Sequence, residues 1–388
     1  SDPEGDYAAN GGGLNYQTGR YRQALKYHQR HWERYAAGKD IDSLKAIGIL
    51  DCIASCYLGL GQYREAVYYE QQGIHTFEEL EGRDAALLAD YYNNLGTIYK
   101  EYGRFEEALA NYQRTQQFYE AREEGLTMQR AGLYLNLCKL YEKLGRFALS
   151  KEYGLKALAY YEQYPEKYIP IAVLRASVYT TLGILEEHGN DYQQAAFYYE
   201  RAAGIYEAAY GRENPWTAGS YNDKGIALTY LGEYDEAFKE LTKAKKIKEA
   251  VYGSFHTSTA NTYHSLSDFY RQKKDYKNAL KWCVKAEKIR KASYGPRNLR
   301  TVRSYELHAA VLYEWGIDLK KALAYISFAF LIYFDAVQKK LCAESQIRFV
   351  QYNLYQIYLA VGNPPEMFAE WVVGERAKLM DGWFERNL

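Results

Sequence analysis

The stretch that decides the fold runs from Gly225 to Ala244 and reads GIALTYLGEYDEAFKELTKA. It has a small residue at each end, a Gly followed two positions later by an aromatic residue (Gly232 and Tyr234), and an Ala at position 237. Small side chains at these intervals allow two helices to cross closely, and the central Gly suits a turn between them. The stretch therefore predicts two helices joined by a tight turn.

The same pattern recurs along the chain, and each copy contains a small residue that we call the anchor. The anchors lie 42, 42, 42, 45, 42, 42 and 43 residues apart, at Ala24, Ala66, Ala108, Ser150, Ala195, Ala237, Ala279 and Ala322. A small residue also precedes each anchor by twelve positions, and Tyr recurs nine and sixteen positions before it. This recurrence accounts for much of the total of 43 Tyr and is typical of packing between helices. Phased copies predict a repeat protein in which each hairpin packs on its neighbours.

Composition narrows the class of protein. The 388 residues are 48% hydrophobic and 25% charged, which predicts a folded chain. Basic and acidic residues balance at 49 each, so we expect neither nucleic acid nor a membrane surface as partner. Five Cys without paired spacing favour a reducing compartment and a cytoplasmic protein. Residues 1–10 resemble a tag or a disordered leader.

The pattern of small, aromatic, Gly, aromatic and Ala residues resembles that of the tetratricopeptide repeat family. The period exceeds the usual 34 residues by eight, so each helix is expected to be about one turn longer. Linkers such as Tyr210-Gly211 to Pro215 resemble those of kinesin-light-chain and nephrocystin-like repeats. The resemblance implies an all-α, right-handed superhelical solenoid of about eight to nine helix-turn-helix repeats. We expect about eight repeats over residues 11–335, with a weak first copy because Gly11-Gly12-Gly13 is a poor helix interior.

The C-terminal part departs from the regular period. Residues 336–388 are expected to form an irregular ninth hairpin and a capping helix, in which Pro364-Pro365 replaces the tight turn. The helix from Trp371 to Asp381 is similar to the helix that joins repeats to the protease domain in CHAT-family proteins. A plain amphipathic capping helix explains the same residues.

Residues that suggest chemistry are few. No nucleotide-binding, zinc-protease, serine-hydrolase or calcium-loop motif occurs, and we predict a protein without catalytic residues, cofactor or metal. His28 and His31, and Cys52 and Cys56, have spacings that would allow metal binding on a helix. Their positions in the repeat favour packing instead.

The resemblance points to a candidate peptide-binding groove. In such solenoids the first helix of each hairpin lines the concave face, where Asn side chains hold extended peptides. An amide suits this task because it both donates to and accepts from a peptide backbone. The groove is then predicted to contain Asn93, Asn94, Lys100, Asn136, Lys139, Asn222, Asn261, His264, Asp268 and Arg271, with Glu187 on the same face. A merely solvated inner face is the alternative.

One region is strongly basic. From Lys224 to Arg303 the chain has 18 basic and 8 acidic residues, a net charge of +10. Two rows of lysines 42 residues apart predict an outer basic ridge made of Lys239, Lys243, Lys246, Lys281, Lys285 and Lys288. The ridge fits a solvated face, and it also fits an acidic partner.

Together these features predict a scaffold that binds a protein or peptide segment, mainly in the concave groove. The alternative is a regulatory or sensor arm of a larger enzyme, either a CHAT-type protease or a signalling ATPase.

Overall fold

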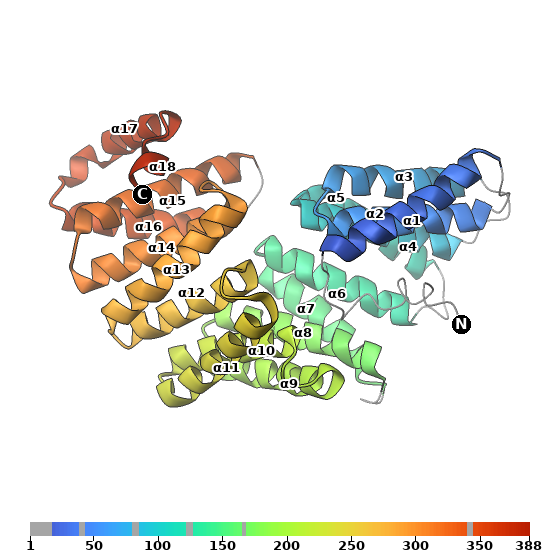
Figure 1. Ribbon diagram of the computed structural model, residues 1–388, viewed down its shortest axis with the longest axis horizontal. Coiled ribbons are helices and arrows are strands. Elements are labelled where there is room, and N and C mark those ends of the chain that lie inside the picture. Colours follow the sequence, from blue (N-terminus) through green and yellow to red (C-terminus); the bar gives the residue numbers. More distant parts are fainter. Residues whose placement is uncertain (1–17, 39–42, 80–84, 122–126, 165–167, 340–343) are drawn as a thin grey trace. The chain divides into compact units, whose positions relative to one another are not determined.

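The computed structural model describes residues 18–38, 43–79, 85–121, 127–164, 168–339 and 344–388, and these residues form helices and turns without any strand (Figure 1). The predicted leader and Gly11-Gly12-Gly13 lie outside the described residues. The chain separates into two compact units, Ser1–Thr181 and Leu182–Leu388, with the boundary inside α8 (Ile169–His188). The longest interval between anchors, the 45 residues from Ser150 to Ala195, spans this boundary.

Unit 1 consists of helical hairpins. Its helices before α8 are α1 (Thr18–Ala36), α2 (Ser43–Gly59), α3 (Tyr63–Glu78), α4 (Ala85–Tyr102), α5 (Phe105–Glu120), α6 (Thr127–Lys143) and α7 (Phe147–Tyr161). Each first helix packs on the second helix of its own hairpin, in the pairs α2 with α3, α4 with α5 and α6 with α7.

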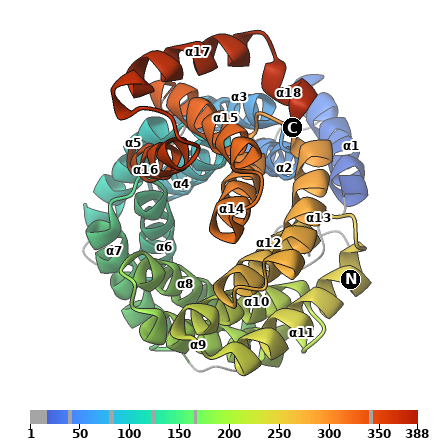
Figure 2. The same ribbon diagram turned by 90° about the vertical axis from the view of Figure 1, so that its left-hand side faces the viewer.

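Unit 2 continues the same architecture. Its further elements are α9 (Tyr192–Tyr210), α10 (Pro215–Leu231), α11 (Tyr234–Tyr252), α12 (Thr257–Gln272), α13 (Tyr276–Tyr294), α14 (Leu299–Trp315), α15 (Leu319–Gln338), α16 (Glu344–Ala360), the 3-10 helix η2 (Pro365–Met367), α17 (Phe368–Met380) and α18 (Trp383–Asn387). Figure 2 shows α10, α12 and α14 on the inner side of unit 2 and α9, α11 and α13 on its outer side. The prediction of an all-α repeat solenoid is confirmed.

The predicted anchors lie at the crossings between helices. Every anchor from Ala66 to Ala322 is fully buried, and Ala24 is half-buried. The small residues twelve positions earlier face large side chains of the second helix. A methyl group added to Gly96 would lie 2.6 Å from the ring of Tyr112, and one added to Gly183 would lie 2.5 Å from the ring of Tyr199. Two helices approach here so closely that only Gly fits.

Turns and caps follow the sequence pattern with two variations. Gly232 ends α10 with φ of 82°, a left-handed conformation that Gly adopts without strain. Two hairpins place Asn190 or Lys274 in this conformation, each with φ of 61°. Between hairpins, Thr259 closes the linker, because its hydroxyl donates to the Gly253 carbonyl at 2.8 Å. Thr217 and Thr301 do the same in the neighbouring linkers.

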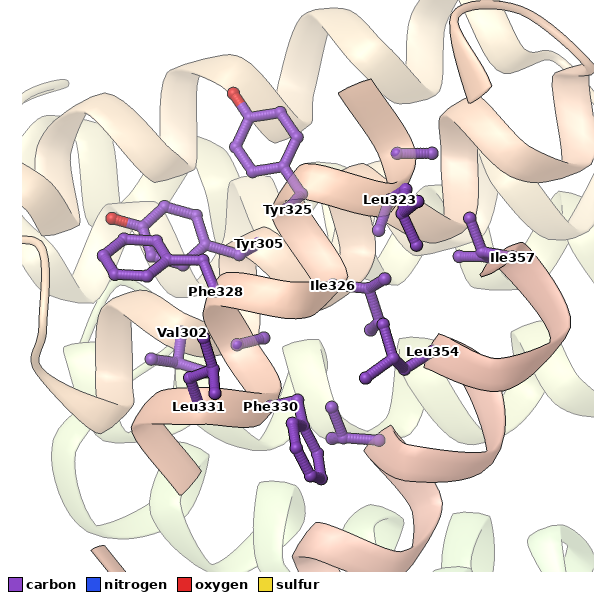
Figure 3. Close-up of a cluster of buried hydrophobic side chains, with 14 of the residues drawn as sticks. Val302, Tyr305, Leu323, Tyr325, Ile326, Phe328, Phe330, Leu331, Leu354 and Ile357 are labelled. Atoms are coloured by element: carbon purple, nitrogen blue, oxygen red, sulfur yellow. The ribbon is translucent and has the colours of Figure 1, made fainter. Parts of the chain in front are cut away.

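The largest core lies at the C-terminal end, where α14, α15 and α16 meet (Figure 3). Helix α15 is long and apolar enough to cross a membrane by length and composition, as is α8, but 67% of its apolar window is buried in this core. Phe328 of α15 stacks on Phe384 of α18, with ring centroids 5.0 Å apart. Helix α17 packs against α15, and its Trp371 contacts Tyr358 of α16.

Candidate functional site

Unit 2 contains a cavity of about 700 Å³ on the inner side of its helices. Its lining residues come mainly from α10, α12, α14 and α16, with the ends of α8 and α9 at one side. The first helices of successive hairpins turn the same face inward, because the repeat length is nearly constant. Side chains from different repeats therefore meet in one space, and four residues predicted to lie on the concave face line it: Glu187, His264, Asp268 and Arg271.

One side of the cavity is an ion-pair network across three hairpins. Arg271 donates to Asp268 on its own helix, at 2.9 Å from Nε and 2.6 Å from Nη2, and its Nη1 donates to Glu314 of α14. Tyr230 of α10 donates its hydroxyl to Asp268 at 2.7 Å. Burial opposes the charge of Arg271, but Asp268 and Glu314 outweigh it and raise the pKa of the guanidinium. These groups hold one another in place.

Arg303 of α14 is different, because it lines the cavity without a partner. It is exposed and makes no ion pair or hydrogen bond within the described part of the chain. Of the nearby carboxyl groups, Glu187 has a pKa raised to about 8, mainly by burial and then by Asp223. Burial also raises the pKa of Glu306. Arg303 lowers both of these pKa values through its charge, but it forms an ion pair with neither carboxyl group, so its guanidinium can take a further partner.

His264 also lines the cavity. Burial, together with Arg290, Arg303 and Arg271, holds the pKa of its imidazole well below the usual range. It is therefore neutral at physiological pH. Arg290 is itself buried and fixed, because it donates to Asn261 Oδ1 at 3.0 Å and to Ser304 Oγ at 2.9 Å.

Another part of the cavity lining is aromatic and comes from α16. Phe349 and Tyr352 line the cavity with 64% and 63% of their surfaces exposed. Large exposed rings of this kind are typical of binding sites. The sequence analysis did not predict Phe349, Tyr352 or Arg303 as site residues. The two aromatic residues lie on α16, beyond the regular repeats, and Arg303 is not one of the Asn residues on which the groove prediction was based. An aromatic pair three residues apart was the available signal.

The predicted groove residues of unit 1 are engaged with neighbouring helices. Asn94 donates to Asp51 Oδ1 at 3.0 Å, and Asn136 donates to Asn93 Oδ1 at 3.0 Å. Burial, followed by the charge of Lys100, lowers the pKa of Lys139 to about 8. These amides bridge successive first helices, and a role in peptide binding stays a prediction.

In unit 2, two further predicted groove residues do not line the cavity. Asn222 is buried and donates to Asp223 Oδ1 at 3.2 Å, while Asn261 accepts from Arg290. The six ridge lysines lie on α11 and α13, where all are exposed except the half-buried Lys243.

The His and Cys pairs whose spacing would allow metal binding lie on helices, where they pack against neighbouring side chains or are largely buried. His28 and His31 lie on α1 with their rings 5.3 and 4.4 Å from that of Tyr27. Burial raises the pKa of Cys52 and Cys56 to about 11, which makes both thiols poor nucleophiles. No three His, Cys, Asp or Glu side chains gather in a metal-binding arrangement in the residues that the structure describes.

Solved structures with a similar fold include two complexes and one protein with several domains. A Rap protein in complex with competence and sporulation factor is 13% identical, with a TM-score of 0.56 over 92% of this chain and 98% of that one. The Rap conjugation regulator of plasmid pLS20 in complex with the Phr* peptide is 12% identical, with a TM-score of 0.57 over 81% of this chain and 77% of that one.

The third is a signal transduction ATPase with numerous domains and a tetratricopeptide repeat sensor, from Pyrococcus horikoshii. It is 14% identical, with a TM-score of 0.52 over 94% of this chain and 54% of that one, so the chain spans about half of its length. At these identities the likenesses show the fold alone.

Sequence comparison identifies the family directly. The comparison with curated proteins gives no match. The model of the tetratricopeptide repeat family matches residues 46–121, 174–250, 216–272 and 258–326, which together cover more than half of the chain. The protein belongs to the tetratricopeptide repeat family.

Proposed function

We propose that the protein is an interaction scaffold that holds a peptide or protein segment in the cavity of unit 2. The observation that carries the proposal is that Arg303, which makes no ion pair or hydrogen bond within the described residues, lines the same cavity as the exposed rings of Phe349 and Tyr352. A guanidinium without a partner favours an anionic group of the ligand, and exposed rings favour an apolar side chain. Two proteins of similar fold, the Rap proteins above, are complexes with a peptide or a factor.

We assign binding rather than chemistry to this cavity. Asp268, Arg271 and Glu314 are committed to one another, and His264 stays neutral beneath Arg290. The hydroxyl of Ser265 donates to a backbone carbonyl of its own helix at 3.1 Å, so no base is placed to activate it. These contacts among the described cavity residues favour a binding role over a catalytic one.

The experiment starts from peptides selected from a random display library against the wild-type protein. Their affinities are then measured by calorimetry with two matched pairs of variants. Arg303→Gln is compared with Arg300→Gln, which removes the same charge one turn earlier on α14 from an arginine that stacks on Tyr294. The double variant Phe349→Ala with Tyr352→Ala is compared with Phe255→Ala, an exposed ring outside the cavity.

We expect Arg303→Gln to weaken binding about tenfold or more, because a charge-assisted hydrogen bond contributes about 1.5–3 kcal/mol. The aromatic double variant should weaken binding to a similar degree, and both controls should stay within about twofold of wild type. If no peptide is enriched, or if selected peptides bind the cavity variants as tightly as wild type, the proposal is wrong.

A sensor role within a larger enzyme is a second proposal. It is favoured by the likeness in fold to the ATPase with a repeat sensor, which extends over 94% of this chain. The selected peptide would then change the activity of an effector domain on the same polypeptide. Unchanged activity on saturation with that peptide would count against this role.

A further inference from the structure

The two rows of ridge lysines on α11 and α13 are equivalent in the repeat but not in their partners. On α11, Lys239 pairs with Glu236 at 3.3 Å and Lys243 pairs with Glu240 at 2.9 Å. Each pair lies three residues apart on one helix, so α11 neutralises these two ridge lysines itself.

On α13 both carboxylates are replaced. The residues 42 positions after Glu236 and Glu240 are Asn278 and Trp282. Lys281 and Lys285 therefore lack the acidic residue that their counterparts have, and neither makes an ion pair within the described ranges. Both are exposed. The positive charge of the ridge is thus concentrated on α13.

Three lysines gather around the indole ring that replaced the carboxylate, and we call this the Trp282 cluster. The ammonium groups of Lys245, Lys281 and Lys285 lie 5.8, 5.9 and 4.8 Å from the centroid of the Trp282 ring. The ring attracts each ammonium through its negative face, which holds groups of like charge close together. Lys245 pairs with Glu249 at 2.9 Å, and the charge of Lys285 also acts on Glu249, so one carboxylate serves the three ammonium groups of the cluster.

We propose that the Trp282 cluster is a second interaction surface that docks an acidic polypeptide segment of a partner. It lies on the outer helices of unit 2, so it is separate from the cavity and goes beyond the function proposed above. Carboxylates of such a segment would supply the partners that α13 lacks. The charge of the cluster and that of an acidic segment are complementary.

The observations favour a polypeptide over a nucleic acid. Single strands bind to basic surfaces by stacking bases on open aromatic rings. Trp282 is half-buried, packs on Tyr263 with ring centroids 5.1 Å apart, and is flanked by the three lysines.

The test uses fluorescein-labelled oligoglutamate of about ten residues as probe, in anisotropy titrations at low salt and at about 0.15 M salt, where the Debye length is about 8 Å. Lys281→Gln with Lys285→Gln is compared with Lys239→Gln with Lys243→Gln. Both double variants lose the same charge at equivalent repeat positions. Circular dichroism checks that both remain folded.

We expect the α13 variant to weaken binding about fivefold or more at low salt and the α11 variant to weaken it less than about twofold. Binding by wild type should also weaken as salt rises. Equal losses of affinity in both variants would mean that the positive charge acts as a diffuse field, and this would overturn the proposal of a site. An unchanged affinity of the α13 variant, or no binding of the probe by wild type, would also overturn it. A single-stranded RNA of similar charge that binds more tightly and depends on the same lysines would assign the surface to nucleic acid instead.

Discussion

The close crossing of α8 and α9 allows a sharp test of the packing argument. In Gly183→Ala the new methyl group would lie 2.5, 2.8 and 2.9 Å from three atoms of the Tyr199 ring. Tyr199 is only 1% exposed, so its ring has no free space into which it can move. The helices must separate or the ring must leave its rotamer.

The magnitude follows from two opposing terms. Overpacking of a tight core costs about 1–3 kcal/mol, while replacing Gly by Ala inside a helix contributes about 1 kcal/mol of stability. The net loss expected for Gly183→Ala is therefore about 1 kcal/mol. Gly204→Ala in α9 is the matched control, because no atom lies within 4 Å of its added methyl group. It should gain about 1 kcal/mol, so the two variants should differ by about 2 kcal/mol.

Urea denaturation followed by circular dichroism measures both variants, and hydrogen exchange of peptides from α8 and α9 locates the change. The exchange measurement is needed because a chain with two units need not unfold in one step. We expect the two midpoints to shift in opposite directions from wild type. If Gly183→Ala is stabilised to the same degree as Gly204→Ala, the crossing is looser than the structure indicates and the reasoning fails.

Two further predictions concern buried carboxyl groups. The pKa of Glu187 is raised to about 8 in the folded protein from an ordinary value of 4.5, so its contribution to stability is present below about 4.5 and is lost as pH rises through 8. The urea midpoint of Glu187→Gln should therefore fall less between pH 6 and 9 than that of wild type, and parallel curves would contradict this. Glu70 in unit 1 is 1% exposed and lies beside Asp51 and Asn94, and burial and the charge of Asp51 raise its pKa. Glu70→Gln should slow hydrogen exchange in α3 at pH 8 but not at pH 4; an equal effect at both pH values would show that ionisation is not the cause.

The helical hairpins and their phase were predictable from sequence because their causes are local and repeated. A small residue such as Ala108 or Gly96 must recur wherever two helices cross, and a turn residue must recur between them. Deviations in some copies, such as those at Asn190 and Lys274, do not hide a signal that the other copies keep. Lys274 replaces the usual Gly in its turn, yet α13 still begins at Tyr276.

The candidate site was only partly predictable. His264, Asp268 and Arg271 were placed on the inner face by their phase in the repeat, and they do line the cavity. The position of a residue in the repeat does not determine which side chains form ion pairs with one another. It therefore did not distinguish Arg271, which has an ion pair, from Arg303, which has none within the described residues. That distinction depends on distances between side chains from different hairpins.

The sequence by itself determined the repeat, the crossings and the basic character of α13, because these depend on residue size, spacing and charge. Only the tertiary structure decided which charges remain available to a partner. Asn94 and Asp51 are 43 residues apart in the chain yet hydrogen-bonded in the fold, whereas Lys285 has an indole ring where Lys243 has a carboxylate. The availability of a charged group depends on its nearest neighbours in space, and in a solenoid those neighbours come from the hairpins on either side.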